Sequence, residues 1–98
     1  MPAAQPMPEP PENKLSIKVF SPFQVFYLGL GESVSAINAV GPFDVLPGHS
    51  NFFSVLERGE VAVNTGGDPV TVAISHGIVH VRYNKVTLFV FGLVGGDQ

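Results

Sequence analysis

The sequence contains no cysteine. This absence excludes disulfide bonds, thiolate nucleophiles, and zinc or iron–sulfur sites built on cysteine ligands. Basic residues are also few, because five Lys and Arg stand against eight Asp and Glu and give a formal net charge of −3. Nucleic-acid binding needs clustered Lys and Arg that displace counterions from phosphates. The composition therefore argues against a nucleic-acid partner.

Long apolar runs are absent as well. The most apolar stretch, Val86 to Val94, is interrupted by Thr87 and Gly92 and falls well short of the roughly 20 residues that a membrane-spanning helix needs. Residues Met1 to Pro11 have no positive charge beyond the amino terminus and no apolar core, so they do not resemble a signal peptide. We expect a soluble, unexported chain without direct membrane insertion.

Eleven Gly and nine Pro argue against a helical bundle, since each of these residues interrupts a helix. The prolines are dense in MPAAQPMPEPPEN, residues 1–13, where they exclude both helix and ladder hydrogen bonding. We therefore expect three regions: a disordered Pro-rich tail over 1–13, a folded domain over 14–92, and a flexible C-terminal end over 93–98.

The folded region alternates apolar and polar residues in the pattern of β-strands. Leu15, Ile17 and Val19 alternate with Ser16 and Lys18, and comparable patterns follow over 70–75, 79–83 and 86–91. Thr65-Gly66-Gly67-Asp68-Pro69 predicts a hairpin loop, and Asn84-Lys85 predicts a two-residue turn. Eight or more short strands without an amphipathic helix indicate an all-β sandwich or barrel.

The segment from Val19 to Leu56 carries only two charges, Glu32 and Asp44. A domain of this size cannot bury so much uncharged chain, so part of the segment should lie at the surface and form a docking face. The alternative is a sandwich whose outer face is merely covered by Ser, Asn, Gln and Thr. Most of the eight phenylalanines are expected in the core; the aromatic residues expected to contribute to docking are Phe23, Phe26, Tyr27, Phe43, Phe52 and Phe53.

No catalytic, cofactor-binding or metal-binding set is expected. His76 and His80 lie in strand-like sequence, where a separation of four residues places their Cα atoms about 13 Å apart, too far to share an ion. Gly31-Glu32-Ser33-Val34-Ser35 lacks the closing glycine of a nucleophile elbow. Gly29-Leu30-Gly31 lacks the third glycine of a dinucleotide fingerprint.

Three segments together resemble a known family. GPFDVLPGHS, Gly41 to Ser50, resembles the stretch Gly-x-hydrophobic-Gly-hydrophobic-hydrophobic-Pro-Gly-His-Ala/Ser in the epsilon subunit of F-type ATP synthases, called delta in mitochondria. SHGIVHV, Ser75 to Val81, with Asn84 to Leu88, resembles the family's Ser-Gly-Gly-hydrophobic-x-x-Val and its next strand. Leu15 to Phe20 with Ser21-Pro22 resembles the family's opening strand.

The resemblance implies a flattened β-sandwich of about ten short strands. It also implies a non-catalytic component of the central stalk in a proton-translocating ATP synthase, which docks on the gamma subunit and the c-ring and couples rotation to ATP synthesis. Such a subunit needs no cofactor and lies at the cytoplasmic face of the inner (plasma) membrane through its complex. The partner interface is carried over to the family's most specific segment: Phe43, Asp44, Val45, Leu46, Pro47, Gly48 and His49.

The sequence also departs from the family. Asp44 stands where the family has its second glycine, and the preceding loop is shorter and lacks an acidic residue. The sequence ends at Gln98, before the C-terminal helical hairpin of typical members, so neither the brake on hydrolysis nor the ATP binding of that hairpin is carried over. The alternative function is a stand-alone small β-sandwich that binds a ligand or assembles with itself.

Overall fold

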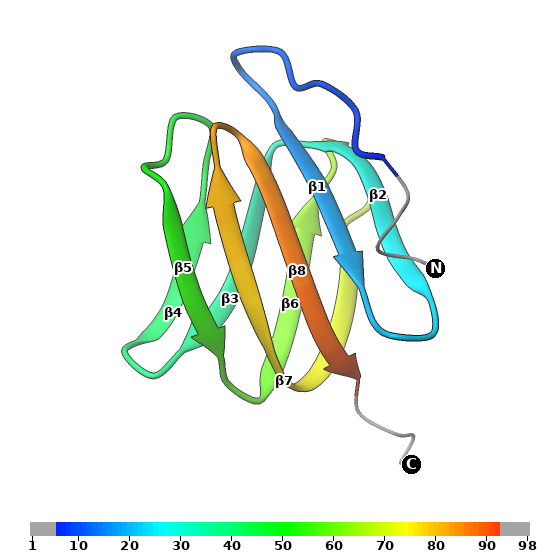
Figure 1. The fold of residues 1–98 in the computed structure, drawn as a ribbon, viewed down its shortest axis with the longest axis vertical. Helices are drawn as coiled ribbons and strands as arrows, with labels where there is room; N and C mark the ends of the chain where they lie inside the picture. The colour runs from blue at the N-terminus through cyan, green and yellow to red at the C-terminus, as the bar shows by residue number, and fades with distance from the viewer. Residues whose placement is uncertain (1–5, 93–98) are drawn as a thin grey trace.

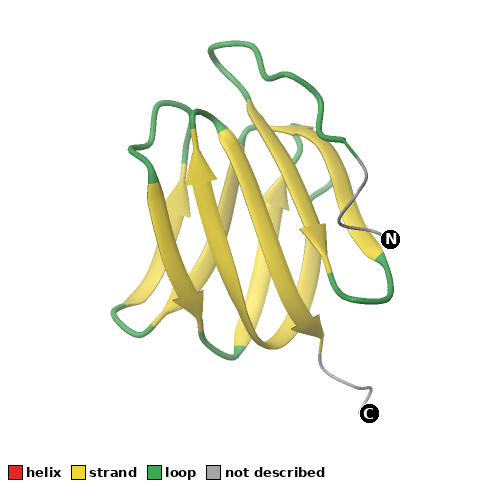
Figure 2. Cartoon of the chain, in the orientation of Figure 1, coloured by secondary structure: helices red, strands yellow, loops and turns green. Residues whose placement is uncertain are grey.

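The alternating segments of the sequence form strands, and the described residues contain no helix (Figure 2). The structure, a computed structural model, describes residues 6–92. Eight strands follow one another along them: β1 (Leu15–Phe20), β2 (Val25–Gly31), β3 (Ser33–Asn38), β4 (Gly41–Val45), β5 (Phe52–Leu56), β6 (Gly59–Asn64), β7 (Val70–Arg82) and β8 (Lys85–Gly92). The predicted all-β class is confirmed, whereas the expected number of about ten strands is not.

The strands form two packed layers because β7 belongs to both (Figure 1). The first part of β7 pairs with β6 up to Ile74, and its second part pairs with β5 from Gly77 onward. The register with β8 shifts between Ile74 and His76, a bulge that bends the strand where it changes layer. One layer contains β5, β7, β8, β1 and β2, and the other contains the start of β7 with β6, β3 and β4.

The core between the layers is almost entirely aliphatic. Burial alternates along β7 and β8, as predicted, so that one set of side chains points inward, whereas β1 is buried throughout from Leu15 to Val19. The buried apolar residues are Leu15, Ile17, Val19, Val34, Ala36, Val45, Leu56, Val61, Val63, Val72, Ile74, Val79, Val81, Val86, Leu88 and Val90. None of the eight phenylalanines is among them, which corrects the expectation that most would be buried. β-Branched residues and leucine fill the thin interior, so the larger rings remain at its margins and outside.

The turn between β7 and β8 differs by one residue from the prediction. Arg82 pairs directly with Lys85, so the two turn residues are Tyr83 and Asn84, not Asn84 and Lys85. Their φ values of 50° and 63° lie in the left-handed region, as a type I′ hairpin requires at both positions. Asn adopts this conformation readily, whereas Tyr does so rarely.

Residues 6–13 form neither helix nor strand, as expected, but they contact the sheet instead of extending freely. Glu9 forms an ion pair with Lys85, and the side-chain amide of Asn84 donates a hydrogen bond to the carbonyl of Glu12. This part of the tail therefore has defined long-range contacts with the sheet, and its disorder stays a prediction. The remainder of the predicted tail, residues 1–5, and the predicted flexible end, residues 93–98, lie outside the described residues.

Candidate docking face

The outer surface of the layer containing β5, β7, β8 and β1, which we call the front face, is formed by rows of side chains in register. One row runs from Phe53 through His80 and Thr87 to Lys18, and the next from Val55 through Ile78 and Phe89 to Phe20. Residues directly opposite each other in paired strands point to the same side of a sheet. Continuing beyond these rows, the front face comprises Phe20, Phe53, Val55, His76, Ile78, His80, Thr87, Phe89 and Phe91, and it ends at Lys18, which is buried.

Large apolar side chains on the front face are open to solvent. Phe53 is 64% exposed and Val55 is 60% exposed, while Ile78 and Phe91 are also exposed. A hollow of about 280 Å³ lies among them, lined by Val55, His76, Gly77, Ile78, Phe89 and Phe91. Contiguous apolar surface of this kind marks an interaction site more often than open water.

Ring contacts hold the aromatic side chains of the front face in place. The Phe89 ring lies 5.1 Å from that of Phe20 and 5.2 Å from that of Phe91. His76 stacks on Phe91 with 4.6 Å between the ring centroids and an angle of 19°. These offset and edge contacts are the favourable geometries for aromatic pairs, so a partner would meet a surface that is already ordered.

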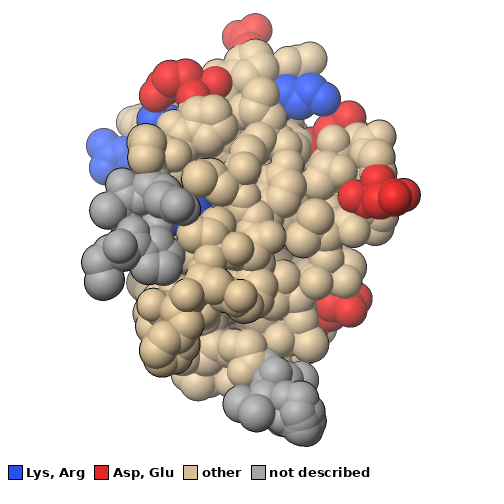
Figure 3. Space-filling view, turned by 90° about the vertical axis from the view of Figure 1, so that its right-hand side faces the viewer, with Lys and Arg blue, Asp and Glu red and all other residues tan. Residues whose placement is uncertain are grey.

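Acidic residues are absent from the layer that carries the front face. The sequences of β1, β2, β5, β7 and β8 contain neither Asp nor Glu. The strands of the opposite layer carry two carboxylates, Asp44 on β4 and Glu60 on β6. On the side of the molecule where β2 lies, charged side chains gather at the top and along the two sides of a broad uncharged surface (Figure 3). The two layers therefore differ in charge, and the front face is the one without negative groups.

The segment from Phe43 to His49 occupies an edge strand and one end of the sandwich, and its side chains do not share one surface. Val45 is fully buried in the core, and Phe43 is half-buried with its ring 5.5 Å from that of Phe52. Asp44 points outward and accepts a hydrogen bond of 2.6 Å from the Ser35 hydroxyl. The alternation of a strand separates neighbouring residues of this segment onto opposite sides.

The loop that follows β4 is fixed to the turn between β7 and β8. The backbone amide of Gly48 donates to the side-chain oxygen of Asn84 at 2.8 Å, and the amide of Tyr83 donates to the side-chain oxygen of Asn51 at 3.1 Å. The imidazole of His49 packs against the Phe52 ring, with 5.5 Å between the centroids. A shallow hollow is lined by Gly48, His49, Ser50, Asn51, Tyr83 and Asn84. Leu46 and Tyr83 are exposed large hydrophobic residues at this end.

The sequence analysis missed the front-face residues of the C-terminal half. Their signal is present, because β8 carries apolar residues in both phases: Val86, Leu88 and Val90 inward, and Phe89 and Phe91 outward. A strand that is apolar on both sides is typical of burial on both faces. Within the described residues Phe91 is only partly covered, by His76 and Phe89, and its remaining exposed surface is available to a partner.

The described residues contain no cluster that could hold a metal ion. His76 and His80 both lie on the front face but contact different rings, those of Phe91 and Phe53. Residues 6–92 contain no helix that is long and apolar enough to cross a membrane.

Comparison with known proteins identifies the family. The sequence model of the ATP synthase delta/epsilon chain, beta-sandwich domain, matches residues 14–94. The chain belongs to this family. The ATP synthase epsilon chain of Geobacter metallireducens is 32% identical over 78 residues, covering 80% of this chain and 56% of that protein. The epsilon chain of Brevibacillus brevis is 34% identical over 77 residues, covering 78% and 58%.

Two solved structures share the fold. A chain of the Euglena gracilis mitochondrial ATP synthase (OSCP/F1/c-ring, rotational state 1) has a TM-score of 0.74 at 20% identity, covering 85% of this chain and 53% of that one. A chain of the Tetrahymena thermophila mitochondrial ATP synthase central stalk/c-ring has a TM-score of 0.68 at 15% identity, covering 82% and 65%. The chain spans little more than half the length of the epsilon chains that it matches.

Proposed function

We propose that this delta/epsilon-type chain is a non-catalytic component of the central stalk in a proton-translocating F-type ATP synthase. It docks on the gamma subunit and the c-ring, so that rotation is coupled to ATP synthesis, and it lies at the cytoplasmic face of the inner membrane through that complex. The family match, the names of the related epsilon chains and the central-stalk structures that share the fold support this proposal.

The front face is the observation on which the proposal depends. It combines exposed aliphatic and aromatic side chains, mutual ring contacts, and a layer without Asp or Glu. Interface centres in general are depleted of charge and enriched in aromatic residues, and a few well-packed anchors provide most of the affinity. We assign gamma to this face.

The end of the sandwich formed by Phe43 to His49 is the proposed second contact, toward the rotor. Asp44, Leu46 and Gly48 are exposed and His49 is half-buried, so these members of the segment can reach a partner, whereas Val45 is buried. The Pro47-Gly48 turn fixes their direction, and its hydrogen bond to Asn84 keeps the loop in place without the partner.

The direct test is co-elution with purified gamma subunit in size-exclusion chromatography. Ile78→Asp places a charge in the centre of the front face and should abolish co-elution while the circular dichroism spectrum stays unchanged. Val40→Asp is the matched control, because Val40 is 97% exposed at the turn between β3 and β4, outside the front face. Equal recovery of gamma by both variants would contradict the assignment of the front face.

The same experiment tests the stand-alone alternative. An exposed apolar face can also bury itself against a second copy, which would appear as a concentration-dependent dimer without gamma. Self-association that Ile78→Asp removes, together with no complex with gamma, would favour a self-assembling module over a stalk subunit.

A further inference from the structure

A basic cluster lies where the front face meets the turn between β7 and β8. Arg82 and Lys85 are directly opposite each other as the last pair of this hairpin, and His80 and Thr87 form the next outward pair. Like charges directly opposite each other in a sheet are destabilising. The Arg82 guanidinium lies 5.5 Å from the Tyr83 ring but has no ion pair with any residue in 6–92. A carboxylate placed between Arg82 and Lys85 would relieve their repulsion.

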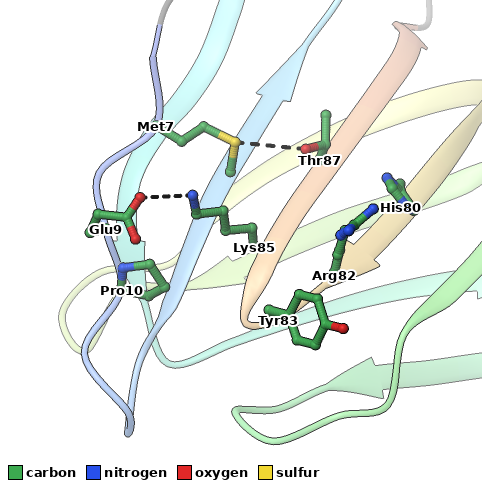
Figure 4. A pocket seen from close by; sticks show the side chains of 8 residues that line it. All are labelled: Met7, Glu9, Pro10, His80, Arg82, Tyr83, Lys85 and Thr87. Atoms are coloured by element: carbon green, nitrogen blue, oxygen red, sulfur yellow. Dashed lines mark hydrogen bonds and ion pairs between the residues drawn. The ribbon is translucent and has the colours of Figure 1, made fainter.

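The chain places one of its own carboxylates beside Lys85. Residues 6–13, which we call the N-terminal strap, cross this end of the face, and Glu9 lies 2.8 Å from the Lys85 ammonium (Figure 4). Strap and sheet enclose a hollow of about 500 Å³. Met7, Glu9 and Pro10 form one wall, and the other is formed by His80, Arg82, Tyr83, Lys85 and Thr87.

Only weak contacts hold the strap. The Glu9 side chain is 85% exposed in its ion pair, and the Thr87 hydroxyl lies 3.7 Å from the Met7 sulfur. The hydrogen bond from Asn84 to the Glu12 carbonyl is 3.3 Å long. Solvent-exposed ion pairs contribute little net stability, and the prolines of the strap cannot join the sheet through ladder hydrogen bonds. Another acidic segment can therefore displace it.

We propose that the cluster of His80, Arg82, Lys85 and Thr87 is a binding site for an acidic peptide segment of a partner protein, and that Glu9 occupies it in the free chain. The occupant is chosen by charge complementarity, because Glu9 already shows how a carboxylate contacts Lys85, while Arg82 lines the same hollow without an ion pair to any residue in 6–92. The strap thus competes with the partner segment. This inference does not require the partner to be gamma.

The test uses the full chain, labelled with nitrogen-15, and hexaglutamate as the probe, with hexaglutamine as the uncharged control. Hexaglutamate should shift the amide resonances of residues 82–87 in a salt-dependent manner, and hexaglutamine should not. Glu9→Gln removes the internal competitor and should tighten hexaglutamate binding about two- to five-fold, since only the strap-free fraction binds. The double variant Arg82→Gln with Lys85→Gln should lose the shifts.

Arg58→Gln is the matched control, because it removes a basic side chain that is exposed between β5 and β6. It should bind hexaglutamate as the unmodified chain does. Equal effects of Arg58→Gln and of the Arg82/Lys85 variant, or no gain from Glu9→Gln, would overturn the proposal. Failure to co-elute with gamma would count against the proposed function alone, whereas these peptide titrations count only for or against the acidic-segment site.

Discussion

Gly77 lies so close to Phe89 in the neighbouring strand that a Cβ on Gly77 would be 2.7 Å from the Phe89 carbonyl oxygen. The same Cβ would be 3.1 Å from the Cα of Val90. Backbone atoms cannot move aside as a side-chain end can, so β7 and β8 would have to separate. This contact lies directly under the apolar hollow of the front face.

Gly77→Ala should therefore lower the free energy of unfolding by about 1–3 kcal/mol, the usual cost of overpacking. Gly67→Ala is the control, because its nearest neighbour would be the Thr65 hydroxyl at 3.9 Å, an ordinary contact. Urea unfolding of both variants measures the difference. If Gly77→Ala were as stable as Gly67→Ala, the result would contradict the close approach of β7 and β8 at Gly77.

Two neighbouring residues in the proposed rotor contact should differ in how much their truncation lowers stability. Val45 is fully buried, so Val45→Ala should lower the free energy of unfolding by about 2 kcal/mol, from about 0.8 kcal/mol per lost methylene plus the cavity. Leu46 is exposed, and Leu46→Ala should change stability by less than about 0.5 kcal/mol. Thermal unfolding distinguishes them, and a larger loss for Leu46→Ala would contradict the register of β4.

The side-chain directions in β4 could be predicted from the sequence alone. Phe43 and Val45 alternate with Pro42 and Asp44, and in the structure the first pair points inward and the second outward. The period of two thus predicts which residues of the family-specific segment can meet a partner. The resemblance alone assigned the whole segment to the interface, including Val45, which the structure buries in the core.

Other features depend on contacts between residues far apart in the chain. Proline density predicts that residues 6–13 form no helix or strand, but it says nothing about the ion pair between Glu9 and Lys85, which are 76 positions apart. The front face likewise depends on how β5, β7 and β8 align. Periodicity predicts that Phe89 and Phe91 point away from Leu88, but only the pairing of strands places them beside Ile78 and Val55.

Asn84 should contribute to stability through both its backbone and its side chain. Glycine adopts the φ of 63° at this position easily, whereas alanine is strained there. The Asn84 side chain accepts a hydrogen bond from the Gly48 amide and donates one to the Glu12 carbonyl. Asn84→Gly loses only the hydrogen bonds, whereas Asn84→Ala also carries a left-handed strain of about 1–2 kcal/mol. The melting temperature should fall further for Asn84→Ala than for Asn84→Gly. Equal melting temperatures would contradict the type I′ turn at Tyr83-Asn84.

Truncation of a front-face ring should weaken gamma binding without unfolding the chain. Phe53 is 64% exposed beside His80 on the front face, so its ring is available to a partner and contributes little to the core. Anchoring aromatics in interfaces contribute about 1–2 kcal/mol or more, so Phe53→Ala should raise the dissociation constant for gamma about five- to thirty-fold. Calorimetric titration of gamma with each variant measures this change.

The control for Phe53→Ala is Phe23→Ala, which removes the same ring from the turn between β1 and β2, where Phe23 is 92% exposed. Both residues belong to the uncharged segment that the sequence marks for docking, so composition alone predicts similar effects. The position of Phe53 on the front face predicts that only Phe53→Ala weakens binding. An equal loss of affinity in Phe23→Ala would mean that gamma binds around the β1–β2 turn, and that the absence of acidic residues from the front layer has another cause.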